Sequence, residues 1–313
     1  MKKILITGGA GFIGSNLCNR LVEQGYNVVA IDNLITSSRK NITPLIEFPN
    51  FKFIKHDITL PFKSEQKKHL KDIDLIFHLA CPTGVPNLLK LGEEMLLTSS
   101  LGTKNILDIA LKEKARVVFT STSEVYGDPL KSPQDEGYAG NVDPVGMRST
   151  YEEGKRFAES LIALYVRKYN LDCRIVRVFN TYGPRMFMSD TRVIPNFIQH
   201  IKEKKKLPLH GNGSQKRTFC YIEDLINGLL IVAEKGKKGE VYNLGSDEEV
   251  SIFVLANMIL SILDLKNGIK KIKRPDHDHS ARMPDLQKMH SLKWLPKTSL
   301  DEGLRRTLQW YGL

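Results

Sequence analysis

The sequence predicts an α/β protein: a Rossmann-like, doubly wound parallel sheet with a smaller C-terminal α/β substrate-binding domain. Three observations predict it. Apolar runs alternate with helical stretches up to about residue 180, the first run leads directly into a glycine-rich turn and a helix, and the alternation breaks up afterwards. A chain of 313 residues that is 41% hydrophobic can bury a large core.

The chain opens with a strand, a tight turn and a helix. Residues 4–6 form an apolar run and residues 15–23 carry helical periodicity. The segment between them contains Gly8, Gly11 and Gly14. Gly8 permits the turn, Gly11 lets the backbone approach a pyrophosphate, and Gly14 allows close helix packing. The helix N-terminus then faces the anion. The residues predicted to bind a dinucleotide here are Gly8, Gly11, Phe12, Ile13 and Gly14.

An acid follows the second strand, which we predict at residues 28–31. Asp32 lies roughly 20 residues after the glycines, where a carboxylate accepts hydrogen bonds from both hydroxyls of an adenosine ribose. Asn33 beside it is included in the predicted site. This acid favours NAD as the cofactor, because NADP sites prefer an arginine at this point. Arg39 lies a few residues later, so NADP remains an alternative.

Further strands are predicted at residues 51–55, 75–78, 116–120, 173–178 and 241–244. Ligands of such sheets bind at the carboxyl ends of the strands. Asp57 and Ile58 follow the third strand, where the carboxylate is either an adenine contact or a plain turn aspartate. Leu79 and Ala80 open a loop of small residues and prolines that is expected to lie against the cofactor.

The second half of the chain is predicted to be a smaller lid over the site. Residues 223–235 and 251–263 have the pattern of amphipathic helices. We assign residues 1–178, with a return segment at about 218–245, to the NAD-binding domain. Residues 179–313 are assigned to a second domain, which is expected to bind the substrate.

The composition predicts a cytoplasmic protein without nucleic-acid or membrane partners. The net charge of +11 is concentrated partly in residues 202–206 and 266–274, but neither run is interleaved with aromatic side chains. We expect solvated faces that also steer an anionic substrate. No apolar run nears the roughly 20 residues that span a bilayer. The four cysteines are scattered, which suggests reduced thiols. The adjacent acids and histidines at 276–279 cannot easily converge on one ion, so no bound metal is expected.

Polar residues suited to proton transfer follow the fifth strand. Thr122 and Ser123 lie at its Ser/Thr-rich end, and Tyr151 and Lys155 are four residues apart, on one face of a helix. An ammonium near a phenol favours the phenolate, so we expect Lys155 to lower the pKa of Tyr151 from about 10. Such a tyrosine can take a proton from a sugar hydroxyl while the carbon gives hydride to a nicotinamide.

Three motifs resemble those of a known family. They are TSTSEVYG at residues 120–127, RSTYEEGKR at 148–156 and FNTYGPRM at 179–186. Over nearly its whole length the chain is similar to the extended short-chain dehydrogenases/reductases, the nucleotide-sugar epimerase/dehydratase family. Within that family the motifs most resemble those of UDP-glucuronate decarboxylases. Dehydratases typically carry an Asp-Glu pair where this chain has Ser123 and Glu124, and 4-epimerases usually lack the acid.

The resemblance implies a bound NAD, a nucleotide-sugar substrate and a homodimer built from helices near residues 90–112 and 151–168. It gives the redox step to Tyr151 and Lys155 with Thr122, and the sugar and its carboxylate to Glu124 and Arg282. The implied catalytic residues are Thr122, Ser123, Glu124, Tyr151, Lys155 and Arg282. The implied substrate-binding residues are Pro82, Asn180, Arg185, Arg192, Val193, His210, Gln215, Arg217 and Arg282.

The loop that borders the sugar departs from the decarboxylase pattern. Residues 80–88 read ACPTGVPNL, where the family usually has ACPASP and then His-Tyr, and His210 replaces an expected tyrosine. The usual Thr-Asn on the next helix is Thr98-Ser99. A 4-dehydrogenase, epimerase or dehydratase of another UDP-, GDP- or dTDP-sugar is therefore the alternative. A non-catalytic dinucleotide-sensing protein is a third interpretation, since fold does not fix function.

Overall fold

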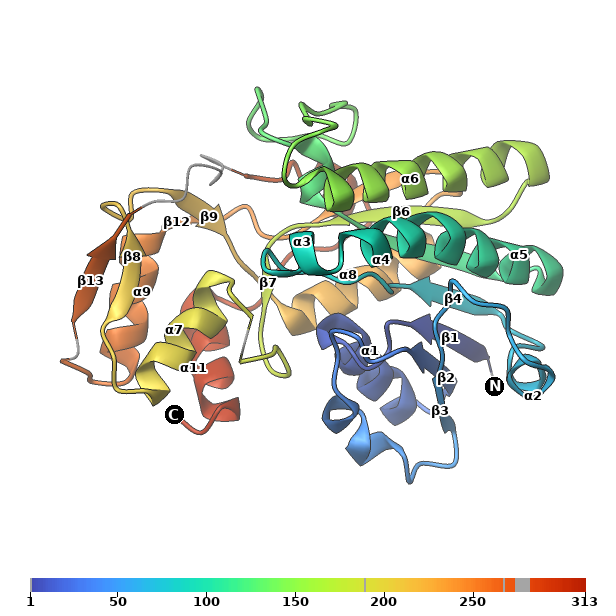
Figure 1. The fold of residues 1–313 in the computed structure, drawn as a ribbon, viewed down its shortest axis with the longest axis horizontal. Coiled ribbons are helices and arrows are strands. Elements are labelled where there is room, and N and C mark those ends of the chain that lie inside the picture. The colour runs from blue at the N-terminus through green and yellow to red at the C-terminus, as the bar shows by residue number, and fades with distance from the viewer. Residues whose placement is uncertain (1, 189, 267, 274–281) are drawn as a thin grey trace.

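The computed structural model describes residues 2–188, 190–266, 268–273 and 282–313, and its centre is a seven-stranded parallel sheet (Figure 1). The strand order is β11-β6-β5-β4-β1-β2-β3, and every neighbouring pair is parallel. The strands are β1 (Lys3–Thr7), β2 (Asn27–Asp32), β3 (Phe51–Lys55), β4 (Leu75–His78), β5 (Arg116–Thr122), β6 (Cys173–Val178) and β11 (Val241–Leu244).

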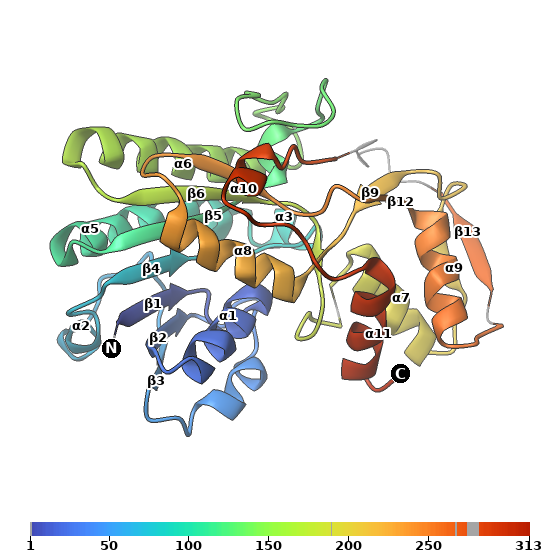
Figure 2. The same cartoon turned by 180° about the vertical axis from the view of Figure 1, so that it is seen from behind.

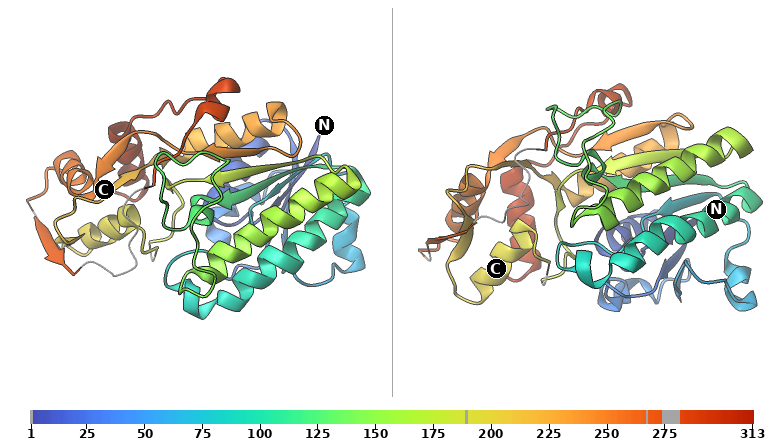
Figure 3. Two further views of the ribbon diagram at one scale, coloured as in Figure 1. Left: turned by 90° about the horizontal axis from the view of Figure 1, so that it is seen from above. Right: turned by 45° about the horizontal axis from the view of Figure 1, so that its top comes forward.

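Helices cover both faces of this sheet, as a doubly wound fold requires. Ile4 and Ile6 of β1 belong to the core under α1 and α8, whereas Leu5 between them belongs to the core under α5 and α6. Figure 2 shows α1 and α8 on one face, and Figure 3 shows α5 and α6 side by side on the other. These helices are α1 (Phe12–Glu23), α8 (Ile222–Lys235), α4 (Gly92–Leu97), α5 (Thr103–Glu113) and α6 (Ser149–Tyr169).

A smaller lobe lies beyond the carboxyl ends of the strands (Figure 1). Its short strands pair as β7–β10 and β8–β13, both parallel, and β9–β12, antiparallel. They are β7 (Thr181–Tyr182), β8 (Leu207–His210), β9 (Lys216–Thr218), β10 (Cys220–Tyr221), β12 (Glu249–Ser251) and β13 (Ile269–Ile272). The helices around them are α7 (Val193–Lys202), α9 (Ile252–Ile262) and α11 (Leu300–Trp310).

Short helices complete the connections between these elements. None of the helices in the described part of the chain combines the length and the apolar character needed to cross a membrane. The short helices are η1 (Arg39–Asn41), η2 (Thr43–Leu45), α2 (Ser64–His69), α3 (Asn87–Lys90), a π-helical turn η3 (Thr98–Gly102), η4 (Ser123–Tyr126) and α10 (Gln287–Ser291).

The predicted strands are confirmed, and four of them have the predicted bounds: β3, β4, β6 and β11. The first helix begins at Phe12, three residues before the predicted start. The prediction missed this first turn because it contains Gly14 and two partly exposed apolar residues, and so lacks a periodic apolar face. The predicted polar loop at 276–279 lies outside the described residues.

Candidate active site

The glycine turn after β1 packs backbone against backbone. Gly8 has φ +70°, and a Cβ at this residue would lie 2.9 Å from Ala80 N. A Cβ on Gly14 would lie 2.1 Å from Gly8 O, whereas one on Gly11 would meet only Gly8 O, at 3.2 Å. Gly9, which the sequence analysis did not single out, would place its Cβ 2.7 Å from that of Ala30. The turn therefore has the tight geometry expected of a pyrophosphate-binding loop.

The N-terminus of α1 opens onto this turn. Its N-cap is Gly11, which has no side chain to accept hydrogen bonds from the first backbone N–H groups of the helix. Such N–H groups at a helix N-terminus bind phosphate oxygens, and the helix dipole favours the negative charge. The backbone at Phe12 and Ile13 thus fits an anionic dinucleotide.

Asp32 is fixed at the end of β2, beside the turn. Its Oδ2 accepts from Ala10 N at 3.0 Å, and its Oδ1 accepts from Leu34 N at 2.8 Å and from Ser37 Oγ at 2.6 Å. The carboxylate is only 8% exposed. These contacts hold it where a ribose can be bound, and the contribution of Ser37 was not foreseen from the sequence.

Asn33 and Asp57 bind each other at the ends of β2 and β3. Asn33 Nδ2 donates to Asp57 Oδ2 at 2.9 Å, and Thr59 donates to Asp57 Oδ1 from its backbone N and its hydroxyl. Burial acts to raise the pKa of Asp57, but these hydrogen bonds outweigh it and lower the pKa. The bonds from Thr59 are those of a turn aspartate, and Ile58 beside it is buried. An adenine contact stays a prediction.

A buried histidine links the glycine turn to the next loop. His78 Nδ1 lies 2.7 Å from Thr7 Oγ1, and its Nε2 lies 3.0 Å from Thr103 Oγ1. Thr7 Oγ1 also accepts from Ala80 N, while Leu79 N donates to Thr7 O. Burial, with a smaller contribution from Lys155, lowers the pKa of His78 to about 3, so this histidine is neutral. It fixes the predicted cofactor loop at Leu79 and Ala80.

The predicted proton-transfer residues meet at the carboxyl end of β5. Thr122 and Tyr151 are joined by a side-chain hydrogen bond. Lys155 is buried; its Nζ donates to Thr120 O at 2.8 Å and lies 4.6 Å from the centre of the Phe119 ring. Tyr151 and Lys155 both belong to α6, as the four-residue spacing predicts.

The prediction that the pKa of Tyr151 is lowered is wrong, because the structure raises it. Burial is the largest influence and raises the pKa of the phenol above its ordinary value. The hydrogen bond from Thr122 and the charges of Arg192 and Arg148 lower it in part. The Lys155 ammonium donates to Thr120 O, and burial lowers the pKa of Lys155 itself. Sequence spacing places the pair correctly but does not reveal this burial.

An ion pair lies beside these residues. The guanidinium of Arg282 pairs with Glu124 through Nη1 to Oε1, and its Nη2 lies 3.1 Å from Oε2. Arg148 binds the same carboxylate through Nη2 and binds Glu152 through Nε at 3.0 Å. Burial lowers the pKa of Arg282 to about 10, so it remains charged at neutral pH. Ser123 precedes Glu124 in η4. The structure thus joins Glu124 to Arg282, 158 residues away.

Arg148 is a site residue that the sequence analysis did not assign a role. It is the N-cap residue of α6, four residues before Glu152 and three before Tyr151. That spacing places an arginine and a glutamate on the same face of one helix, a signal that could have marked it.

Most of the remaining predicted substrate residues lie in the smaller lobe and the segments leading to it, and Pro82 lies in a loop of the central sheet. Arg192 is the N-cap of α7, which begins at Val193; it pairs with Asp190 and lies 6.0 Å from the Phe12 ring centre. His210 ends β8, and its carbonyl accepts from Gln215 Nε2 at 3.3 Å. The others are Pro82 in the loop after β4, Asn180 directly after β6, and Arg217 in β9.

Arg185 lies apart from this group. It has φ +72°, and its guanidinium donates to Ser15 O at 2.7 Å and to Asn19 Oδ1 at 3.2 Å. Both acceptors belong to α1, so Arg185 holds that helix, and its predicted contact with substrate gains no support from this geometry.

The glycine turn, the fixed acid after β2 and the tyrosine–lysine pair together define a dinucleotide-binding protein of the short-chain dehydrogenase/reductase class. The model of the NAD dependent epimerase/dehydratase family matches residues 4–245. The chain belongs to this family, whose members depend on NAD.

Relatives of known name match over nearly the whole chain. UDP-glucuronic acid decarboxylase 1 of Danio rerio is 40% identical over 99% of this chain and 73% of its own length. UDP-glucuronic acid decarboxylase 3 of Arabidopsis thaliana is 42% identical over 96% of this chain and 86% of its own. A solved structure of UDP-glucuronic acid 4-epimerase from Bacillus cereus, in complex with UDP-glucuronic acid and NAD, is similar with a TM-score of 0.89. It is 30% identical and covers 99% of both chains.

Proposed function

We propose that this protein is an NAD-retaining UDP-glucuronate decarboxylase that works through a 4-keto intermediate. The observation that carries the proposal is the Glu124–Arg282 ion pair beside Tyr151, in a chain whose named relatives at 40–42% identity are UDP-glucuronic acid decarboxylases. A guanidinium and an acid beside a tyrosine base suit a substrate that carries both a hydroxyl and a carboxylate.

The cofactor is held by the first half of the chain. Gly8, Gly11 and Gly14 leave room for the pyrophosphate at the N-terminus of α1, and Asp32 takes the adenosine ribose. NAD, when bound, supplies the acceptor and later the donor of one hydride. We propose residues 1–178, with 218–245, as the NAD-binding domain and 179–313 as the nucleotide-sugar-binding domain.

Tyr151 takes the proton of the C4 hydroxyl. Thr122 bonds to the phenol and shares the hydrogen bond of that hydroxyl. Burial raises the pKa of the phenol, and the hydrogen bond from Thr122 with the charges of Arg192 and Arg148 offsets part of that rise, which is the direction a base requires. Lys155, fixed on Thr120 O, lies at the same buried end of the sheet.

The substrate itself explains why an acid and a cation are needed at the other end of the sugar. A ketone at C4 is β to the C6 carboxylate, so the C5–C6 bond can break and carbon dioxide leaves. The electrons of that bond stay on the sugar and form an enolate between C4 and C5. Arg282 binds the carboxylate and Glu124 orients Arg282 and the sugar. Protonation at C5 and return of the hydride to C4 give the pentose, with no net redox change.

The pyrophosphate of the substrate is proposed to bind Asn180, Arg192 and Arg217.

We also propose a homodimer. Exposed apolar side chains gather on α4, η3 and α6, which is unusual for a surface left in water; they are Leu96, Leu97, Leu101, Phe157 and Leu164. A cytoplasmic location, expected from the sequence, stays a prediction.

Turnover of UDP-glucuronate tests the proposal. The purified protein should release carbon dioxide and UDP-pentose without added cofactor, and Tyr151→Phe should lose most of this activity while it still binds NAD. Mass spectrometry of the nucleotide products measures both results. An unchanged substrate with the wild-type protein would contradict the proposal.

A 4-epimerase of UDP-glucuronate is the second candidate. The altered loop at residues 82–88 and the similarity to a 4-epimerase complexed with UDP-glucuronic acid favour it. The same assay separates the two, because an epimer has the mass of the substrate whereas the decarboxylated product has lost carbon dioxide. Screening GDP- and dTDP-sugars by mass covers the oxidation and dehydration alternatives.

A further inference from the structure

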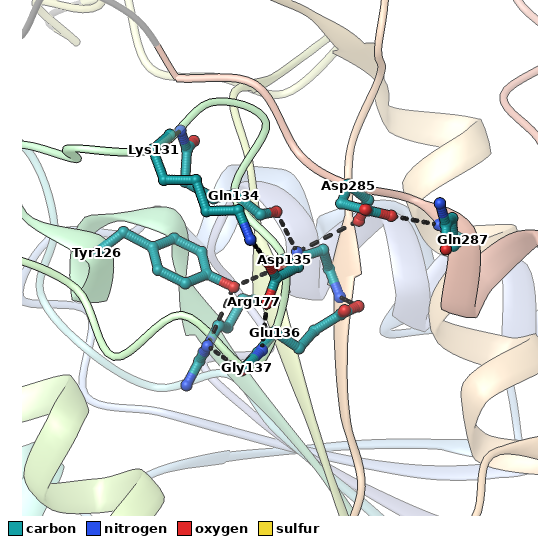
Figure 4. A network of polar contacts seen from close by, with 10 residues as sticks. Tyr126, Lys131, Gln134, Asp135, Glu136, Gly137, Arg177, Asp285 and Gln287 are labelled. Atoms are coloured by element: carbon teal, nitrogen blue, oxygen red, sulfur yellow. Dashed lines mark hydrogen bonds and ion pairs between the residues drawn. The ribbon is translucent and has the colours of Figure 1, made fainter.

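Gln134, in the loop after η4, attaches this loop to the segment that carries Arg282. Gln134 N donates to Met283 O at 2.8 Å, and Met283 N donates back to Gln134 Oε1 at 3.1 Å. Asp285 N donates to Gln134 O at 2.7 Å. Gln134 and Pro284 form an isolated parallel β-bridge. Figure 4 shows Gln134 facing this segment. Its amide and backbone thus hold the chain immediately after Arg282.

Gln134 is completely buried, and its polar atoms are satisfied. Its side-chain Nε2 donates to Lys131 O, and its backbone carbonyl oxygen also accepts from Asn243 Nδ2 at 2.9 Å. A buried amide must make its hydrogen bonds, because a buried polar group without a partner destabilises the fold. The position of Met283 relative to Gln134 is therefore well determined.

The same network reaches the element that carries Glu124. Asn243 Oδ1 accepts from Tyr126 Oη at 2.7 Å, and Tyr126 belongs to η4 together with Glu124. Arg177 Nη1 donates to Tyr126 Oη at 3.0 Å, as Figure 4 shows. One chain of buried hydrogen bonds therefore fixes both elements whose side chains form the ion pair.

We infer that Gln134 is a positioning residue that holds the Arg282 guanidinium on Glu124, and so controls decarboxylation but not oxidation at C4. The inference rests on the proposed function. Gln134 is completely buried and acts through the backbone of Met283. Tyr151 and Thr122 belong to α6 and β5, so loss of the Gln134 side chain leaves them in place.

Gln134→Met tests this role, since methionine keeps the volume and removes both side-chain hydrogen bonds. The rate of carbon dioxide release should fall roughly 10- to 100-fold, because a misplacement of about 1 Å at a reacting centre has effects of this order. Reduction of the bound nicotinamide, followed by absorbance after mixing with UDP-glucuronate, should keep its wild-type rate. Gln287→Met is the matched control: Gln287 lies on the same segment with its side chain exposed, so both rates should stay at wild-type values.

Two further variants separate positioning from simple loss of structure. In the Arg282→Lys background, Gln134→Met should have little additional effect, because residues that act as one unit are not additive. Gln134→Glu keeps the acceptor for Met283 N–H and, once protonated, donates to Lys131 O. Burial raises the pKa of a carboxyl group, so the carboxyl group introduced in this variant should become protonated as pH falls from about 8 to about 6. The rate of decarboxylation by Gln134→Glu should then recover towards the wild-type rate. Equal loss of both rates, or an additive double variant, would overturn the inference.

A crystal structure of Gln134→Met gives a reading that does not depend on turnover. We expect the Arg282 guanidinium to be displaced from Glu124; an unchanged ion pair would overturn the inference. If the wild-type protein releases no carbon dioxide, the proposed decarboxylase activity fails, and this structure still decides whether Gln134 holds Arg282.

Discussion

Gly14→Ala is the substitution whose effect on cofactor binding follows most directly from the structure. The new Cβ would lie 2.1 Å from Gly8 O, and the next neighbours, Gly8 C and Gly9 Cα at 2.9 Å, are also backbone atoms. Ordinary contact begins near 3.4 Å, so α1 and the turn must separate by about 1.3 Å. No flexible side chain can relieve the clash.

The expected magnitude follows from this displacement. Overpacking costs about 1–3 kcal/mol, and each 1.4 kcal/mol changes a dissociation constant about tenfold. If opening of the turn relieves the strain, the Kd for NAD should rise roughly 5- to 150-fold. Isothermal titration calorimetry measures this directly, and the increase in Tm on adding NAD should shrink accordingly.

Gly25→Ala is the matched control for this substitution. It adds the same methyl group at the other end of α1, where φ is +81° and no heavy atom lies within 4 Å of the new Cβ. Backbone strain should lower stability by about 1–2 kcal/mol and leave the Kd for NAD unchanged. Wild-type NAD affinity in Gly14→Ala would refute the assignment of this turn as the pyrophosphate site.

Three other outcomes are expected. Asp32→Ala should weaken NAD binding about tenfold or more, because a charge-assisted hydrogen bond contributes about 1.5–3 kcal/mol, and should reduce the preference for NAD over NADP; equal loss for both cofactors in a titration would contradict the ribose assignment. Arg177→Met should lower the free energy of unfolding in urea by about 3–5 kcal/mol, since it leaves Glu159, 12% exposed, without the arginine that binds both its oxygens. Arg177→Met with Glu159→Leu should regain part of this loss, and a double variant less stable than the single one would disprove the reasoning. For His78, the folded pKa of about 3 lies below the ordinary 6.5, so stability is full above pH 6.5 and falls by up to about 1.4 kcal/mol per pH unit below it, as only the unfolded chain takes up the proton. His78→Gln should show a shallower slope between pH 7.5 and 5.5 in urea titrations, and an equal slope would argue against a buried neutral histidine.

Local sequence patterns were sufficient for the parallel sheet and for the residues on single elements. Apolar runs locate β3, β4, β6 and β11 with the observed bounds, because buried parallel strands are continuously apolar. Tyr151 and Lys155 share a helix face for the same local reason.

Contacts between distant segments, and the burial that they cause, could not be predicted from such patterns. Gln134 lies in a loop without periodicity, and its partners Met283 and Asp285 are about 150 residues away. The pKa of Tyr151 depends on how deeply the assembled site buries the phenol, which a four-residue spacing does not contain. Arg185 matches a family motif, but its guanidinium is directed to α1 by tertiary packing.

The central claim is that one hydride leaves C4 of UDP-glucuronate and returns to the same carbon after carbon dioxide is lost. UDP-glucuronate labelled with deuterium at C4 tests it, with mass spectrometry of the product formed without added cofactor. The account predicts a UDP-pentose that has lost carbon dioxide and retains the deuterium. A product that keeps its carboxylate, or a pentose whose deuterium has been replaced by hydrogen from solvent, would contradict it.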